Sequence, residues 1–204
     1  MTLQAAAPRL ILASGSPSRA ALLRGAGLAF EVRPAAVDEA EVKGRARAEG
    51  ALADTTALLL AELKAHVIAR LDPEALVIGA DQLLVCDDRW FDKPADMAEA
   101  RAHLLALRGR THTLVTAVLC QHGAHRLWHH IARPRLTMRP FSDAFLADYL
   151  ALEGANLTTT VGGYRLEGPG AHLFDAIAGD HSAILGLPLL PLLAFLRRHG
   201  VLGE

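Results

Sequence analysis

Residues 9–27 read RLILASGSPSRAALLRGAG, and this stretch decides the fold class. Its apolar start, residues 10–13, predicts a short buried strand, and SGSPS predicts a loop. Pro17 suits the first turn of a helix, because proline lacks an N–H that a helix start would leave unpaired. We expect that helix to run on until Gly25 and Gly27 close it. The stretch therefore predicts a strand, a loop of small residues and a helix in succession.

The rest of the chain continues this alternation, and strands cluster in its middle. Strands are expected near residues 30–32, 75–79, 83–86, 111–119 and 127–136, and helices over 52–70, 96–107 and 142–150. The charged segment 37–51 is expected to be exposed, and residues 184–198 to form a strand followed by a helix. This order favours a mixed α/β sheet with helices packed on it. No repeat or linker interrupts the chain, so we expect one domain over residues 1–204.

Composition narrows the classes of function. The formal net charge is -1, which disfavours bulk binding to nucleic acid or to a membrane surface. No apolar run approaches the roughly 20 residues that a membrane-spanning helix needs, and no secretory signal is visible. The two cysteines, Cys86 and Cys120, lie in apolar runs and do not suggest a disulfide framework. We therefore expect a cytoplasmic protein.

The loop between the first strand and helix is a candidate phosphate site. A helix start offers free backbone N–H groups and the positive end of the helix dipole. Ser14, Ser16 and Arg19 would add hydroxyl and guanidinium donors suited to phosphate oxygens. The alternative is a capping loop beside a surface arginine. The loop lacks the GK[ST] ending of a Walker A motif.

Carboxylates and lysines supply further candidates. Asp81 follows the apolar run ALVIGA, and the ends of buried strands are where open α/β sheets bind ligands. Such a carboxylate could hold Mg²⁺ or activate water, or it could simply begin a turn. Glu39 lies in an acidic pair that could equally be solvated. Lys64 is placed among apolar residues of a helix and Lys93 precedes a proline, so each could reach a phosphate or remain a solvated lysine.

Histidines and hydroxyls do not form a recognisable site elsewhere. The histidines near residues 122–130 lie around an expected hairpin, and no cysteine follows at zinc-ligand spacing. A nucleophile elbow of the form GxSxG is absent, so a serine hydrolase is unsupported.

Taken together, these segments resemble the Maf-like nucleotide pyrophosphatase family over almost the whole chain. LILASGSPSRAALL is similar to the family's N-terminal signature, AAVDE to its acidic pair, and VIGADQ and DKP to its central motifs. LRGRTHTLVTAV, GGYRLEG and AGDHSAILGLPL are similar to its later segments. One departure is Ser18, which stands where the family often has a second arginine.

The resemblance implies a curved mixed β-sheet flanked by helices, with two lobes and a central cleft. It implies a pyrophosphatase that cleaves nucleoside triphosphates between the α- and β-phosphates with a divalent metal, Mg²⁺ or Mn²⁺. It assigns phosphate binding to Ser14, Ser16, Arg19, Lys64 and Lys93, metal binding to Glu39 and Asp81, and the catalytic acid/base to Asp81.

Two residues bear on the choice of base. Gln82 together with Glu167 resembles the branch of the family that acts on 7-methylguanosine triphosphate. Guanine presents N–H donors along its Watson–Crick edge, and the Glu167 carboxylate could accept hydrogen bonds from them. The segments FDKP and LRGRTHTL resemble a third branch, so the preferred base stays a hypothesis.

A binding role is the main alternative to an enzyme. Members of the family have been linked to arrest of septum formation, so the chain could be a nucleotide-binding regulator of cell division without turnover. The acids and lysines favour the enzyme, because simple binding does not need carboxylates beside phosphates. A homodimer is compatible with a domain of this size, and the sequence does not show an interface.

Overall fold

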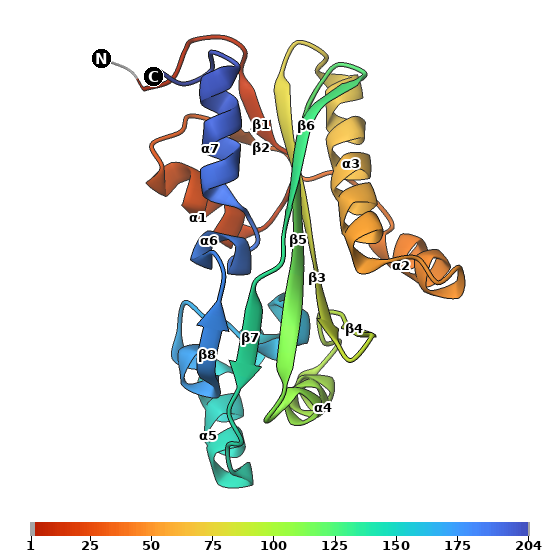
Figure 1. Ribbon diagram of the computed structural model, residues 1–204, viewed down its shortest axis with the longest axis vertical. Helices are drawn as coiled ribbons and strands as arrows, with labels where there is room; N and C mark the ends of the chain where they lie inside the picture. Colours follow the sequence, from red (N-terminus) through yellow and green to blue (C-terminus); the bar gives the residue numbers. More distant parts are fainter. Residues whose placement is uncertain (1–2, 204) are drawn as a thin grey trace. The chain divides into compact units, whose positions relative to one another are not determined.

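A computed structural model describes residues 3–203 of the chain (Figure 1). The strands form a mixed sheet in the order β2-β1-β3-β5-β7-β8, with β4 on β3 and β6 on β5. The chain divides into two compact units. The first comprises residues 1–81, 116–132 and 186–204, and the second comprises residues 82–115 and 133–185. The expected mixed α/β sheet is confirmed, whereas the single domain stays a prediction.

The first unit combines parallel and antiparallel strands. Its strands are β1 (Leu10–Leu12), β2 (Glu31–Val32), the first half of β3 (Leu76–Cys86), the second half of β5 (Thr111–His122) and β6 (His125–Ala132). Its helices are α1 (Pro17–Gly25), α2 (Glu39–Ala48), α3 (Ala53–Leu71) and α7 (Leu189–Arg198). β1 pairs in parallel with both β2 and β3, and β5 pairs antiparallel with β6.

Strand periodicity distributes these helices over the two faces of the sheet. Alternate residues of β1 and β3, such as Leu12 and Ile78, pack with α1 and α7 in one apolar core. The intervening residues face α3, where Gly79 lies so close that a Cβ would be 2.2 Å from the Ala61 carbonyl oxygen. Figure 1 shows α1 and α7 on one side of these strands and α3 on the other.

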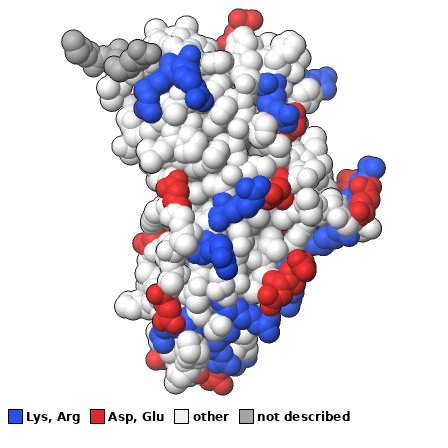
Figure 2. All heavy atoms as spheres, viewed as in Figure 1, with Lys and Arg blue, Asp and Glu red and all other residues white. Residues whose placement is uncertain are grey.

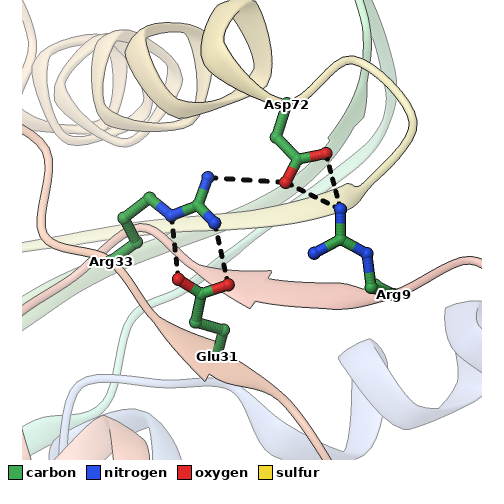
Figure 3. A network of polar contacts seen from close by, with 4 residues as sticks. All are labelled: Arg9, Glu31, Arg33 and Asp72. Atoms are coloured by element: carbon green, nitrogen blue, oxygen red, sulfur yellow. Dashed lines mark hydrogen bonds and ion pairs between the residues drawn. The ribbon is translucent and has the colours of Figure 1, made fainter.

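A network of ion pairs joins the strands of this unit to the end of α3 (Figure 3). Asp72 caps that end and accepts hydrogen bonds from Arg9 at 2.9 and 3.0 Å and from Arg33 at 3.4 Å. Arg33 also pairs with Glu31 at 2.8 Å. The network ties β1, β2 and α3 together, so it supports the helix that carries Lys64.

The second unit is antiparallel. It holds the remainder of β3 and β5, with β4 (Arg89–Phe91), β7 (Arg135–Met138) and β8 (Phe174–Ala178). Its helices are α4 (Met97–Leu107), α5 (Asp143–Glu153) and α6 (His181–Ile184), with short 3₁₀ segments η1 (Gly154–Thr159), η2 (Val161–Gly163) and η3 (Pro169–Leu173). A separate apolar core, including Leu84, Leu104, Leu114 and Leu146, fills this unit.

Several local predictions are confirmed. Pro17 begins α1, and α1 ends at Gly25. The helices expected over 96–107 and 142–150 are α4 and α5, which are capped by Asp96 and Ser142. The CDDRW segment, residues 86–90, turns from β3 into β4. Asp87 and Asp88 adopt positive φ there, as a tight hairpin requires.

Residues 37–51 are mostly exposed, as expected, and they contain the helix α2, which Asp38 caps by accepting from the Glu41 N–H at 2.9 Å. Three expectations were wrong. Residues 75–79 and 83–86 do not form two strands but belong to the single strand β3, so Asp81 lies within a strand and not at its end. Residues 127–136 are shared between β6 and β7 instead of forming one strand, and Pro134 lies at the break. No strand occurs within residues 184–198 of the described chain, and the late strand is β8 instead.

Charges are mixed over the visible surface. Figure 2 shows Lys and Arg side chains lying among Asp and Glu side chains on the face it displays. Within residues 3–203, no helix combines the length and apolar character needed to cross a membrane.

Candidate active site

Lys64 and Asp81 meet where α3 packs on β3. Asp81 follows Gly79 by two residues and therefore points to the same face of the strand, toward α3. Lys64 lies on the buried stripe of α3 with Ala57, Leu60 and Ala61. Its Nζ lies 2.5 Å from Asp81 Oδ1, and the two side chains are only 8% and 5% exposed. The close approach permitted by Gly79 thus produces a buried ion pair.

Glu39 completes an acidic pair around the same lysine. It is the first residue of α2, and its Oε1 lies 2.6 Å from Lys64 Nζ. Lys43 lies one turn later, with its Nζ 3.8 Å from Glu39 Oε2. Two carboxylates therefore share the Lys64 ammonium, while Asp81 Oδ2 is buried without a hydrogen-bond partner among the described residues.

The loop after β1 forms the other side of the site. Ser16 caps α1 by accepting from the Arg19 N–H at 3.4 Å, and the Ser16 N–H donates to Ser14 Oγ at 3.3 Å. Ser14 is buried and Ser16 is half-buried. The start of a nine-residue helix thus adjoins two serine hydroxyls, the arrangement that favours an anion.

Arg19 is oriented into the protein rather than outward. Its Nη1 donates to Ser14 Oγ at 2.8 Å and to the Ala80 carbonyl at 2.9 Å, and its Nε donates to the Gly186 carbonyl at 2.8 Å. Burial lowers the pKa of Arg19, whereas the charges of Asp81 and Glu39 act in the opposite direction. Arg19 therefore fixes the serine loop against the middle of β3.

Gln82 and Lys93 belong to the second unit. Gln82 follows Asp81 along β3, and its Nε2 donates to the carbonyls of Ala183 and Ile184 at 3.0 and 3.1 Å. Lys93 is exposed, and the preceding residue, Asp92, accepts from the Gly162 N–H at 3.2 Å. Lys93 is thereby placed next to the glycine-rich segment that contains Glu167.

Glu167 lies in the turn after η2, with its side chain 32% exposed and its Oε1 3.8 Å from Arg165 Nε. Arg165 also approaches Glu153, whose side chain is 4% exposed, at 3.7 Å. Sequence reasoning missed Glu153. A signal was present, because Glu153 continues the buried stripe of α5 formed by Leu146 and Tyr149.

The predicted site residues thus fall into two groups. Five of them lie within the first unit, where Arg19 bonds to Ser14, and Lys64 pairs with Glu39 and Asp81. Arg19 also donates to the carbonyl of Ala80, the residue before Asp81. Ser16 joins this group through the α1 cap. The other three lie in the second unit: Gln82, Lys93 and Glu167.

A separate hollow of about 590 Å³ occurs in the first unit. It is lined by residues of the N-terminal segment and of the α1–β2 connection, including Leu3, Leu10 and Phe30. None of the predicted site residues lines it, and it lacks their paired carboxylates and lysine.

Comparison with known proteins shows which family the chain belongs to. The family model described as "Maf-like protein" matches residues 9–199. A protein of Granulibacter bethesdensis named nucleoside triphosphate pyrophosphatase is 58% identical over 95% of this chain and 98% of its own length. A protein of Rhodospirillum rubrum with the same name is 54% identical over 98% of this chain and 99% of its own length. A protein of Rhizobium etli named 7-methyl-GTP pyrophosphatase is 46% identical over 96% of this chain and 98% of its own length. By its match to the family model and to these relatives over nearly all its length, this chain belongs to the Maf-like protein family.

Proposed function

We propose that this protein hydrolyses nucleoside triphosphates to nucleoside monophosphate and pyrophosphate. The observation that carries the proposal is the buried lysine shared by two carboxylates, one of which has an oxygen without a hydrogen-bond partner among residues 3–203. Phosphoryl transfer needs positioning and stabilisation of charge more than covalent chemistry, and such a cluster supplies both. The names of the relatives from Granulibacter bethesdensis and Rhodospirillum rubrum support the same reaction.

The triphosphate is proposed to bind at the start of α1. The hydroxyl groups of Ser14 and Ser16, together with the positive end of the α1 dipole, favour the binding of phosphate oxygens there. Lys64 and Lys93 would contribute positive charge. Arg19 would act mainly by holding Ser14, because its Nε and Nη1 already donate to protein acceptors.

A divalent cation fits the acidic pair. Asp81 Oδ2 is an unpartnered buried acceptor, and Glu39 lies across the same lysine. Within residues 3–203, no group of three or more His, Cys, Asp or Glu side chains could hold a metal ion. Magnesium commonly takes only one or two protein carboxylates and completes its shell with water and phosphate oxygens, so Glu39 and Asp81 suffice. The bound ion would stabilise the charge that develops on the phosphates.

Asp81 is the proposed general base. Its Oδ1 is held by Lys64, which fixes the carboxylate, and Oδ2 has two lone pairs, one for the cation and one to accept a proton from water. The water oxygen forms a bond to the α-phosphorus, the bond from that phosphorus to the bridging oxygen breaks, and pyrophosphate leaves. Lys64 would hold the Asp81 carboxylate in a fixed orientation during this step.

Glu167 and Gln82 are the proposed residues for base selection. Glu167 is partly exposed on a turn, where its carboxylate could accept N–H donors of a guanine edge. The Rhizobium etli relative is named for 7-methyl-GTP, which supports a methylated guanine nucleotide as one substrate. Such an enzyme would remove modified nucleotides from the nucleotide pool. We propose a cytoplasmic location, since Cys86 and Cys120 are both free thiols.

The test is a screen for pyrophosphate release with Mg²⁺ across unmodified and modified nucleoside triphosphates. Wild type should yield monophosphate and pyrophosphate, and Asp81→Asn should remove at least about 99% of the turnover. Glu62→Gln, which alters a partly exposed carboxylate of α3 paired with Arg126, should retain turnover and serves as the control. Nucleotide binding by a folded wild type without any release would favour the regulator of cell division instead.

A further inference from the structure

The segment that carries Glu167 is held rigidly at its start. The Tyr164 hydroxyl and His112 Nε2 are 2.7 Å apart and share a hydrogen bond, and both side chains are buried. Thr160 Oγ1 donates to the Tyr164 carbonyl at 2.8 Å, and the Gly162 N–H donates to the Asp92 carbonyl at 3.2 Å. The backbone leading into residue 165 is therefore fixed on both sides of η2.

The segment then closes upon itself. A Cβ on Gly170 would lie 2.2 Å from the Arg165 carbonyl oxygen, so the backbones of these two residues are in contact. Residues 166–168 form the turn between them, and Glu167 is at its centre. This closed turn is tied to the sheet through Tyr164. The backbone that carries the side chains of Arg165 and Glu167 is therefore held in place.

One guanidinium lies between two carboxylates. Arg165 Nη1 is 3.7 Å from Glu153 Oε2, and Arg165 Nε is 3.8 Å from Glu167 Oε1. Glu153 is 4% exposed, and its Oε2 has no hydrogen-bond partner among residues 3–203. A buried carboxylate needs a nearby cation, and Arg165 is the cation that approaches it. Glu153 therefore keeps Arg165 from turning entirely toward Glu167.

We infer that Glu153 and Arg165 are positioning residues that set the base preference of the enzyme through Glu167. The inference rests on the proposed contact between Glu167 and the base. Arg165 orients the Glu167 carboxylate, and Glu153 draws away part of the positive charge, so that Glu167 remains a strong acceptor for the N–H donors of guanine. Removing the charge of Glu153 would let Arg165 pair fully with Glu167 and weaken that acceptor.

The experiment measures relative affinity for 7-methyl-GTP and UTP, by calorimetry in EDTA so that turnover does not interfere. Glu153→Gln should lower the preference for 7-methyl-GTP by about tenfold, because a base donor would meet a neutralised acceptor. Affinity for UTP should change by less than about threefold. Asp143→Asn, which breaks the exposed pair with Arg108, is the matched control and should leave the preference unchanged.

A double-mutant cycle shows whether Glu153 acts through Glu167. In a Glu167→Gln background, Glu153→Gln should have no further effect on the preference. Arg165→Lys, at a position that is 33% exposed, gives a second test should Glu153→Gln fold poorly, and it should also lower the preference. Equal changes for both nucleotides, or additive effects in the cycle, would overturn the inference. Absence of pyrophosphate release by wild type would instead refute the proposed reaction, and the binding preference would still be measurable.

Discussion

The ammonium group of Lys64 lies 2.5 Å from Oδ1 of Asp81, whereas Oδ2 of the same carboxylate is buried and unpartnered within the described chain. The same ammonium lies 2.6 Å from Glu39 Oε1. Lys64 therefore stands as the local cation for two carboxylates, one on α2 and one on β3. A metal ion bound by Glu39 and Asp81, as proposed, would also balance the charge of these carboxylates. Its binding should therefore change the free energy of unfolding.

Lys64→Met should lower the free energy of unfolding by about 3–5 kcal/mol in EDTA, because it leaves Asp81 buried without its cation. Magnesium should restore part of this loss, since an ion bound by Glu39 and Asp81 stabilises the folded state by mass action. Urea unfolding with EDTA and with MgCl₂ measures both effects.

The control is Arg126→Met, which removes a partly exposed partner of Glu62. That substitution should cost no more than about 1 kcal/mol and should respond to magnesium as wild type does. If magnesium failed to stabilise Lys64→Met beyond its effect on wild type, the acidic pair would not be the metal site.

Gly79→Ala should damage both stability and turnover. The added Cβ would lie 2.2 Å from the Ala61 carbonyl oxygen and would push α3 off β3, separating Lys64 from Asp81. Overpacking of this kind costs about 1–3 kcal/mol or more. The expected result is a lower urea midpoint together with a fall in kcat that exceeds the fraction of unfolded protein.

Gly44→Ala provides the matched control, because a Cβ there meets open space within α2. It should raise stability by about 0.5–1 kcal/mol and leave kcat unchanged. A Gly79→Ala enzyme with normal kcat would show that the spacing of α3 and β3 does not set the chemistry.

Local signals allowed much of the fold to be predicted, and their strength explains what was missed. Asp96 and Ser142 lie directly before apolar helical patterns, so α4 and α5 could be located. The helix α2 buries only Lys43 and Ala46, so it lacks the apolar stripe that identifies a helix. β8 is largely exposed and short, and its strand character depends on pairing with β7, which is distant in sequence.

The site shows a similar division. The position of Asp81 could be predicted only in part, because β3 continues past it to Cys86 instead of ending before it. The helix start at Ser16 could be anticipated, because Pro17 follows it. The orientation of Arg19 could not, because its acceptors include backbone carbonyls 61 and 167 residues away. Any residue type provides a carbonyl, so these contacts leave no trace in the pattern of the sequence.

Arg19→Lys tests whether Arg19 holds the loop or only binds phosphate. The lysine keeps the charge but cannot reproduce the donors to Ser14, Ala80 and Gly186, so the free energy of unfolding should fall by about 2–3 kcal/mol. Arg24→Lys, at an exposed position of the same helix, should cost less than about 0.5 kcal/mol. Urea unfolding of both variants and their KM for the triphosphate distinguish the two roles of Arg19. Wild-type stability with a raised KM would mean that Arg19 contacts the substrate directly.

His112 should make the protein sensitive to acid. Burial lowers the pKa of His112 to about 4, and its Nδ1 has no hydrogen-bond partner among residues 3–203. An unfolded histidine has a pKa of about 6.5, so below that pH the unfolded state binds more protons and stability falls as the pH decreases toward 4. Between pH 7 and pH 5 this one group should cost about 2 kcal/mol. Urea unfolding of His112→Asn at both pH values should show a pH dependence smaller by that amount, whereas His125→Asn, on the exposed strand β6, should keep the wild-type slope. Parallel curves for wild type and His112→Asn would mean that His112 does not titrate with unfolding, and that acid sensitivity arises from other groups.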